Sequence, residues 1–187
     1  MTTICTVRKL DRDDAEAWAL LRQEALEAHP LAFSATVPED PKTLAGSFLT
    51  RLTSNGESAV FGAFIDDSLI GIAGVRRNPG GKERHKAMIW GMYVTAGSRR
   101  KGVGDMLLRT AIRQARSWAG VEQVRLAVSE VAEGARRLYE RNGFQEWGRE
   151  PRALCWEGRW ADESHMVLEL RQSQSTAYTD FQMYEDG

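Results

Sequence analysis

The chain has 187 residues, a formal net charge of −1, and 42% hydrophobic and 27% charged residues. This length fits one domain with a substantial core, and a near-neutral charge gives no overall attraction to nucleic acid or to an anionic membrane. No apolar run approaches the roughly 18 residues that a membrane-spanning helix needs, and the N-terminal residues lack the apolar stretch of a secretory signal. We therefore expect a cytoplasmic protein whose partners include neither nucleic acid nor membrane.

The cysteines and histidines give no sign of a metal site. Cys5 and Cys155 lie far apart in strand-like apolar contexts, and we interpret both as reduced and buried. The three histidines, His29, His85 and His165, are not spaced as metal ligands. No metal is therefore expected.

The N-terminal half predicts one strand, two helices and then three antiparallel strands. Asp11 is a candidate N-cap for the first helix, and Pro30 ends it. Asp40-Pro41 opens the second helix and Asn55-Gly56 ends it. A tight turn at Asp66-Asp67-Ser68 joins two strands as a hairpin. The expected ranges are a strand over 4–10, helices over 11–29 and 42–54, and strands over 58–66, 68–77 and 85–94.

The C-terminal half predicts a helix of about five turns, because apolar residues recur at helical spacing from Val103 to Trp118. The next strand, over 121–128, lies beyond a crossover from the strand over 85–94, so these two strands should be parallel. A short helix over 131–144 and closing strands over 144–149 and 165–170, with a hairpin near 156–160, complete the pattern. The sequence therefore predicts an α/β fold of the mixed α+β type. We expect a single domain over 1–170 and a polar tail over 171–187.

The strongest functional signal is the segment from Arg99 to Gly104. Its basic residues run straight into two glycines, directly after a strand and at the start of a helix. A helix N-terminus has free backbone N–H groups and a partial positive charge, which together bind anions, and glycines let an anion approach the backbone. The segment fits neither the P-loop nor the Gly-x-Gly-x-x-Gly pattern. It predicts a phosphate or pyrophosphate site, the alternative being a solvated glycine-rich turn.

Two motifs resemble those of a known family. Arg99-x-x-Gly102-x-Gly104, preceded by "GMYV", resembles the acetyl-CoA signature of the GNAT superfamily of N-acetyltransferases, and "ARRLYERNGF" at 135–144 resembles its second signature. The likeness extends over residues 4–170 and includes the order of the elements. It implies a GNAT-like fold, in which a central, mostly antiparallel sheet splays between its fourth and fifth strands and carries helices on both faces.

The resemblance also implies acetyl-CoA as co-substrate. Main-chain groups at the end of the strand over 85–94 would pair with the pantetheine arm, and N–H groups of the glycine segment would hold the pyrophosphate. The fourth and fifth strands would leave a slot for the thioester between them, and Gly91 suits a β-bulge beside this slot. The family often has an asparagine where this chain has Ala132, so one contact with the pantetheine is weakened. The expected acetyl-CoA contacts are Met92, Tyr93, Val94, Arg99, Arg100, Lys101, Gly102, Val103, Gly104 and Ser129.

The implied reaction is direct attack of a primary amine on the thioester in a ternary complex. The Met92 amide would stabilise the oxyanion. Tyr139 stands where the family has its general acid, the alternative being a core tyrosine with a satisfied hydroxyl. The strand over 85–94 lacks the internal glutamate that many relatives carry. The candidates for the base are therefore Glu83, His85 and Glu150, or a chain of waters, and His85 could equally be a surface strand residue.

The acceptor pocket should be built from the segments 28–40 and 149–160, which we expect to be irregular. Arg149 and Arg152 could hold a carboxylate or phosphate of the acceptor, or belong to a solvated basic loop. Trp90 would wall the slot or simply pack in the core. The expected acceptor contacts are His29, Phe33, Trp90, Arg149 and Arg152.

Three functions are compatible with these patterns. The first is an acetyl-CoA-dependent N-acetyltransferase, an acyltransferase acting on an unidentified small-molecule or peptide amine. The second is a non-catalytic acyl-CoA-binding GNAT-fold sensor or partner protein, and the third is a phosphate- or RNA-binding α/β protein, which the net charge disfavours. Turnover separates the first two. The expected partner is the amine acceptor, and pairing of two copies through edge strands into a homodimer is left open.

Overall fold

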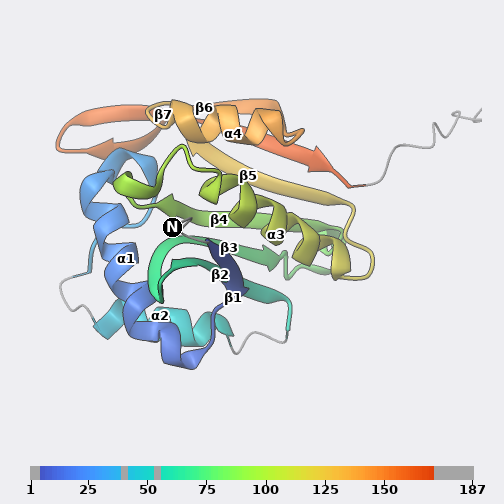
Figure 1. Ribbon diagram of the computed structural model, residues 1–187. Helices are drawn as coiled ribbons and strands as arrows, with labels where there is room; N and C mark the ends of the chain where they lie inside the picture. The colour runs from blue at the N-terminus through green and yellow to red at the C-terminus, as the bar shows by residue number, and fades with distance from the viewer. Residues whose placement is uncertain (1–4, 39–41, 53–55, 171–187) are drawn as a thin grey trace, which may run out of the picture.

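The computed structural model describes residues 5–38, 42–52 and 56–170. Within these ranges, strands and helices follow one another in the order that the sequence predicts (Figure 1). The strands are β1 (Thr6–Lys9), β2 (Ser58–Ile65), β3 (Ser68–Arg77), β4 (Lys86–Val94), β5 (Gln123–Ser129), β6 (Gln145–Trp156) and β7 (Arg159–Glu169). The α-helices are α1 (Ala15–Ala28), α2 (Lys42–Leu52), α3 (Val103–Ser117) and α4 (Glu133–Arg141).

The described strands form one mixed sheet in the order β1-β2-β3-β4-β5-β7-β6. Every neighbouring pair is antiparallel except β4 and β5, which are parallel as the crossover through α3 requires. The predicted β2–β3 hairpin is confirmed, because Asp66 and Asp67 have φ of 45° and 62° in a two-residue turn. Asp11 is the N-cap of a short 3-10 turn that leads into α1.

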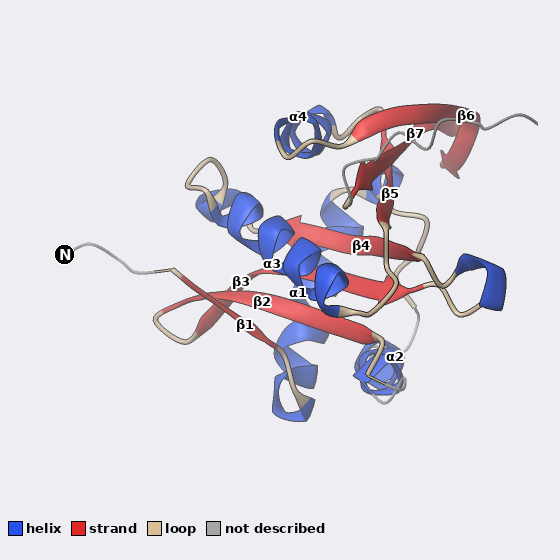
Figure 2. Ribbon diagram, turned by 90° about the vertical axis from the view of Figure 1, so that its right-hand side faces the viewer, coloured by secondary structure: helices blue, strands red, loops and turns tan. Residues whose placement is uncertain are grey.

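Two hydrophobic cores lie on opposite faces of the sheet. Leu107 and Leu108 of α3 and Tyr139 of α4 belong to one buried cluster. Trp18 of α1 and Phe48 of α2 belong to the other. Figure 2 shows the two pairs of helices on either side of the strands. Helices on both faces are therefore confirmed, and any group that enters the sheet between two strands meets different helices on its two sides.

A β-bulge changes which side chains of β4 face each core. The register with β3 shifts between Trp90 and Tyr93, where β4 has one residue more than β3, and Gly91 has a φ of +62° there. Ile89 packs on the α3 side before the bulge, and Met92 does so after it. Trp90 and Tyr93 both pack on the α1 side. The bulge expected at Gly91 is confirmed, and it reverses the alternation of the strand.

The structure corrects two expectations about the C-terminal hairpin. The stretch 149–160 was expected to be irregular, but most of it lies in β6, whose pairing with β7 shifts on both sides of Pro151. Proline and bulges are tolerated because β6 is an edge strand. Cys155 is free as expected but exposed rather than buried, because the hairpin extends beyond the helices that cover the rest of the sheet. The helix boundaries expected at Asp40-Pro41 and Asn55, and the tail 171–187, lie outside the described residues.

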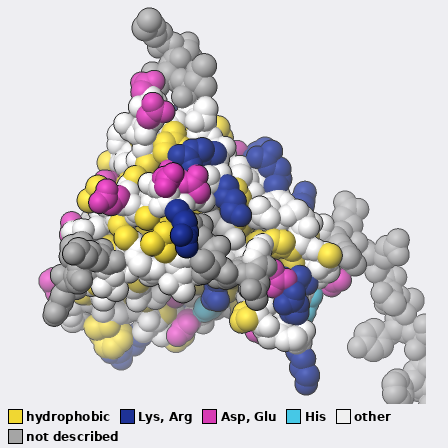
Figure 3. Space-filling view, turned by 90° about the horizontal axis from the view of Figure 1, so that it is seen from below, with side chains coloured by type: hydrophobic (Ala, Val, Ile, Leu, Met, Phe, Trp, Pro, Cys, Tyr) yellow, Lys and Arg dark blue, Asp and Glu magenta, His cyan; other side chains and the backbone are white. Residues whose placement is uncertain are grey.

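The surface carries both signs of charge. Seen from below in Figure 3, acidic, basic and apolar side chains share the same face of the molecule. Among the helices of the described ranges, none combines the length and apolarity that crossing a bilayer requires.

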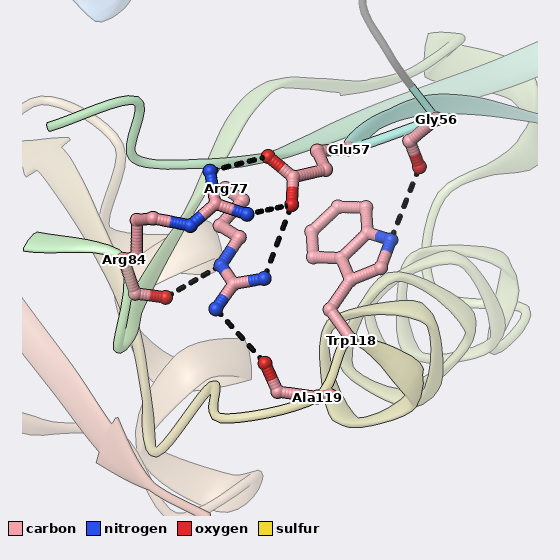
Figure 4. A network of polar contacts seen from close by, with 6 residues as sticks. All are labelled: Gly56, Glu57, Arg77, Arg84, Trp118 and Ala119. Atoms are coloured by element: carbon pink, nitrogen blue, oxygen red, sulfur yellow. Dashed lines mark hydrogen bonds and ion pairs between the residues drawn. The ribbon is translucent and has the colours of Figure 1, made fainter. Parts of the chain in front are cut away.

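Arg77, at the end of β3, ties together the connections that enter β4 and β5 (Figure 4). Its guanidinium donates hydrogen bonds to the Glu57 carboxylate at 3.1 Å, to the Arg84 carbonyl oxygen at 2.6 Å and to the Ala119 carbonyl oxygen at 2.8 Å. Arg84 pairs with the same Glu57 carboxylate. Since Arg84 precedes β4 and Ala119 precedes β5, the network fixes the end at which these two strands pair.

We predict that Arg77→Ala lowers the free energy of unfolding by about 2 kcal/mol, because a mostly buried cation and its hydrogen bonds to three partners are lost. Urea denaturation measures this change. Arg76→Ala is the matched control, since Arg76 is exposed, and we expect it to change the free energy of unfolding by less than about 0.5 kcal/mol. Equal effects of the two substitutions would contradict the role of the network.

Candidate active site

The sheet opens between β4 and β5. These parallel strands pair only from Lys86 to Met88 on β4 and from Gln123 to Arg125 on β5. Beyond that point β5 continues alongside β7 instead, and in Figure 2 the strands β5, β6 and β7 lie together, apart from β4. The predicted splay is therefore confirmed. Backbone groups of β4 and β5 beyond Met88 and Arg125 face each other without a strand-to-strand ladder.

The β4 bulge lies on the open stretch of this gap. A bulge leaves its extra residue out of the ladder with the neighbouring strand, so backbone groups at Gly91 and Met92 are available on the open side. The backbone from Met92 to Val94, including Tyr93, borders the same gap. This is the arrangement that an extended pantetheine arm or an oxyanion would need.

The glycine segment leads into α3 through two left-handed residues. Arg100 has a φ of 61° and Gly102 a φ of 81°. Gly102 is the N-cap and supplies no side-chain hydrogen bond, so the N–H groups of Val103, Gly104 and Asp105 have no intrahelical acceptor. A Cβ on Gly102 would meet no atom within 4 Å. The helix start is thus open to an anion, and the strained conformation of a non-glycine residue at Arg100 is typical of a functional loop.

Gly104 has a different reason for being glycine than the sequence suggested. A Cβ there would lie 3.2 Å from Leu138 Cδ2 of α4. Gly104 therefore allows close packing of α3 against α4, in addition to any approach of an anion. Among the other expected contacts of this segment, Arg100 and Lys101 are exposed and the Val103 side chain is buried.

Arg99 and His29 form a bridge between the glycine segment and the end of α1. Arg99 donates a hydrogen bond from Nη2 to His29 Nε2 at 2.8 Å and from Nε to the Val94 carbonyl oxygen at 2.9 Å. Because arginine only donates, His29 Nε2 is the acceptor, and burial together with the Arg99 charge lowers the pKa of His29. His29 was expected in the acceptor pocket, but the structure engages it with the cofactor-side segment. Within the described part of the chain, no carboxylate pairs with Arg99.

Tyr139 lies on the α4 side of the sheet, in the buried cluster that also contains Val128 of β5. Its ring packs against Phe144, with centroids 5.9 Å apart, and burial raises the pKa of its hydroxyl to about 12. The hydroxyl makes no hydrogen bond to any residue in the described ranges. The alternative of a satisfied core tyrosine therefore has no support in the structure. A hydroxyl without a protein partner is available to a bound group.

Ser129 ends β5 and is buried, and its Oγ has no partner in the part of the chain that the structure describes. It borders a cavity beside α4 together with Arg136 and Ser164. In the strand register, however, Ser129 pairs with Glu163, and paired residues share a face of the sheet, so the cavity does not fix the direction of the Ser129 hydroxyl. Its expected contact with the pantetheine stays a prediction.

Two of the three candidate bases lie at the closed end of the strand pair. The His85 carbonyl oxygen accepts hydrogen bonds from Glu122 N and Gln123 N. Glu83 pairs with Lys86 at 3.0 Å, and this partner lowers the pKa of its carboxyl group. Both residues precede the paired stretch, whereas the gap opens after it. The structure therefore gives neither of them access to the open stretch.

Glu150, the third candidate, lies within a group of titratable side chains on the β6–β7 hairpin. Its Oε2 is 3.3 Å from His165 Nε2, and it stands opposite Glu163 in the strand register. Like charges at directly opposite positions are unfavourable in a sheet. Burial, and then the charge of Glu150, raise the pKa of Glu163, while His165 opposes them.

The segment after α1 covers the gap from the α1 side. The short 3-10 helix η2 (Pro30–Ala32) contacts both β5 and β6. Phe33 follows it, and the Arg22 guanidinium carbon lies 4.5 Å from the centre of the Phe33 ring. A Cβ on Gly91 would lie 3.8 Å from Arg22 Nη1. Phe33 and Arg22 therefore approach the bulge on the face where we expect the acceptor.

Trp90 faces away from the gap. A Cβ on Gly74 of β3 would lie 2.2 Å from its indole, so the ring lies flat over Gly74 and packs with the α1 core. The packing interpretation of Trp90 is therefore the better one.

Arg149 and Arg152 are already engaged within the hairpin. Arg149 pairs with Glu130 at 2.8 Å and with Asp162 at 2.9 Å. The Arg152 N–H donates to Asp162 at 2.8 Å, and its guanidinium carbon lies 4.0 Å from the centre of the Trp160 ring. In this structure two carboxylates already pair with the Arg149 charge, so a contact of Arg149 or Arg152 with an acceptor anion stays a prediction.

Sequence reasoning missed Arg22, Glu163 and His165 as residues near the gap. The alternation of Glu163 and His165 with buried Ser164 and Met166 was visible in the sequence. The sequence could not show the pairing of β7 with β5, which brings these side chains beside the open stretch.

Comparisons with known proteins identify the family and the fold. A sequence model described as the acetyltransferase (GNAT) family matches residues 18–144. An N-acetyltransferase from Staphylococcus aureus is structurally similar, with a TM-score of 0.80 and 18% identity over 90% of this chain and 100% of that one. No curated protein sequence matches significantly.

Two further solved structures share the fold. A phosphinothricin acetyltransferase from Sinorhizobium meliloti, in complex with acetyl-CoA, has a TM-score of 0.79 and 20% identity over 95% of this chain and 94% of that one. A ribosomal-protein-alanine N-acetyltransferase from Brucella melitensis has a TM-score of 0.77 and 22% identity over 88% of this chain and 99% of that one. At these identities the likeness shows the fold.

Proposed function

Because the chain belongs to the GNAT acetyltransferase family, we propose that it transfers the acetyl group of acetyl-CoA to the nitrogen of a primary amine. The observation that carries this proposal is the opening of the sheet. β4 and β5 pair over three residues each and then part beside the Gly91 bulge. A thioester arm threaded there would lie between backbone groups of β4 and the α4 side chains that follow β5.

The residues present fit acetyl-CoA as a substrate. The open N-terminus of α3 and the uncompensated charge of Arg99 suit its pyrophosphate, and the bulge exposes backbone donors beside its thioester. Acetyl-CoA would supply an activated acyl group. The protein would orient that group, exclude water from it, and donate a hydrogen bond from Tyr139 to the departing sulfur.

The two proton transfers would take place on opposite sides of the gap. Tyr139 belongs to the core on the α4 side and would reach the gap from there, while the acceptor would enter from the α1 side, beneath η2 and Phe33. The pKa of Tyr139, about 12, lies above that of an ordinary thiol, about 8.5. Complete proton transfer to the thiolate is therefore unfavourable, and Tyr139 would act by donating a hydrogen bond while the thiolate is protonated from solvent.

The test is thiol release from acetyl-CoA by the purified protein across a panel of amines. The panel contains free amino acids, phosphinothricin, a peptide that begins with alanine, a polyamine and an aminoglycoside. We expect acceptor-dependent turnover on at least one of them. Binding of acetyl-CoA without turnover on any member would contradict the transferase and favour an acyl-CoA-binding sensor instead.

A further inference from the structure

Glu163 lies level with the β4 bulge, on the side of the gap formed by β5 and β7. Met88 and Arg125 are the last paired residues of β4 and β5. Four residues further on are Met92 and Ser129, and Ser129 pairs directly with Glu163 of β7. Opposite residues of antiparallel strands have Cα atoms about 5 Å apart. The register therefore places Glu163 on β7, the strand next to β5, at the level of the β4 backbone that would bind the oxyanion.

The side chain of Glu163 lies on the acceptor face. The neighbouring residues Ser164 and Met166 face α4, because Ser164 Oγ accepts a hydrogen bond from Arg136 and Met166 belongs to the α3–α4 core. Alternation along β7 then turns Glu163 to the opposite face. This is the face that η2 covers through its contacts with β5 and β6.

We propose that Glu163 is the general base of this protein, taking the proton of the acceptor's ammonium group directly or through one bound water. The proposal rests on the proposed transferase function. The freed amine lone pair forms the bond to the acetyl carbon, and the carbon–sulfur bond breaks with its electron pair on sulfur. Sulfur takes up a proton and the acetylated nitrogen loses its second one, so each turnover releases one proton to solvent.

The surroundings of Glu163 suit this role. Its carboxyl group is partly buried and raised in pKa by that burial, which brings it closer to neutral pH, where a base is most effective. Charged groups on this side of the sheet include Glu150 from β6, His165 from β7, Arg125 from β5 and Arg22 from α1. Glu150 and His165 are positioning residues, because they act on Glu163 through its charge.

The test compares Glu163→Gln with Glu169→Gln. Glu169 lies on the same strand and the same face, but opposite Gln123 at the closed end of the gap. With the most active amine of the panel, we expect Glu163→Gln to lower kcat at neutral pH about 100-fold and to move the fall of kcat/KM toward acid pH up to the higher pKa of the amine itself. Activity of Glu163→Gln should recover at alkaline pH, where the amine loses its proton unaided. Glu169→Gln should keep both the rate and the profile.

A glutamine variant that stays within about threefold of wild type, or that loses activity with an unchanged pH profile, overturns the assignment. Failure of the proposed function looks different, since the wild-type protein would then turn over no amine. A readout without acetyl-CoA is the carboxyl-carbon NMR titration of Glu163, identified by its loss in Glu163→Gln. We expect a midpoint above about 4.3, the ordinary glutamate value, and a lower midpoint in Glu150→Gln. A midpoint at or below the ordinary value also overturns the proposal.

Discussion

Replacing Gly91 by valine should lower kcat/KM for acetyl transfer at least about 100-fold. A β-branched residue is strongly disfavoured at the φ of +62° that Gly91 adopts. The cause is conformational and not steric, because a Cβ there would find its nearest neighbour only at 3.8 Å. The chain can relieve the strain only by giving up the bulge.

Losing the bulge would move every later residue of β4 to the opposite face. Met92 and Tyr93 would exchange places between the two cores, and the backbone donors would leave the open side of the gap. Steady-state kinetics and acetyl-CoA titration measure the loss. Gly97→Val is the control, since Gly97 has open space around it and no positive φ, and it should keep activity within about twofold. A Gly91→Val protein with wild-type kinetics would refute the importance of the bulge.

Tyr139→Phe should lower the activity without lowering the stability of the protein. We expect kcat to fall about 100-fold, because the departing sulfur loses its hydrogen-bond donor, while the affinity for acetyl-CoA changes little. The free energy of unfolding should change little, since the hydroxyl that is removed has no hydrogen-bond partner in the described ranges. The ring packing against Phe144 is kept.

The measurements are single-turnover kinetics, acetyl-CoA binding by calorimetry and urea denaturation on the same preparation. Because the pKa of Tyr139 is about 12, its ionisation should cause no loss of wild-type activity on raising the pH from neutral to about 10. Phe144→Leu, which alters the packing around Tyr139 but keeps its hydroxyl, is the matched control. A Tyr139→Phe protein that loses stability and keeps its rate would show that the tyrosine serves packing alone.

Local patterns were sufficient to predict the order of the elements, and the family resemblance implied the opening of the sheet. Helical spacing placed α3, and the crossover through it required β4 and β5 to be parallel. Gly91 was recognisable because a glycine inside a strand commonly marks a bulge. These features depend on residues close together in the sequence or on rules of chain connection.

The partners of individual side chains could not be predicted in the same way. The pairing of Arg149 with Asp162 depends on the β6–β7 hairpin, and the packing of Gly104 against Leu138 depends on the position of α4. Glu163 became a candidate only through the β5–β7 register. Each depends on strand or helix pairing between distant segments, which composition and periodicity do not encode. Pairing of two copies of the chain stays a prediction.

The most direct test of this account is the transfer of a carbon-labelled acetyl group from acetyl-CoA to the amine panel, followed by mass spectrometry and NMR of the products. We predict that at least one acceptor gains a single labelled acetyl group on its nitrogen, in amounts that match the released thiol, and that Glu163→Gln slows this transfer at neutral pH. Acetyl-CoA that binds while every acceptor remains unlabelled would contradict the account.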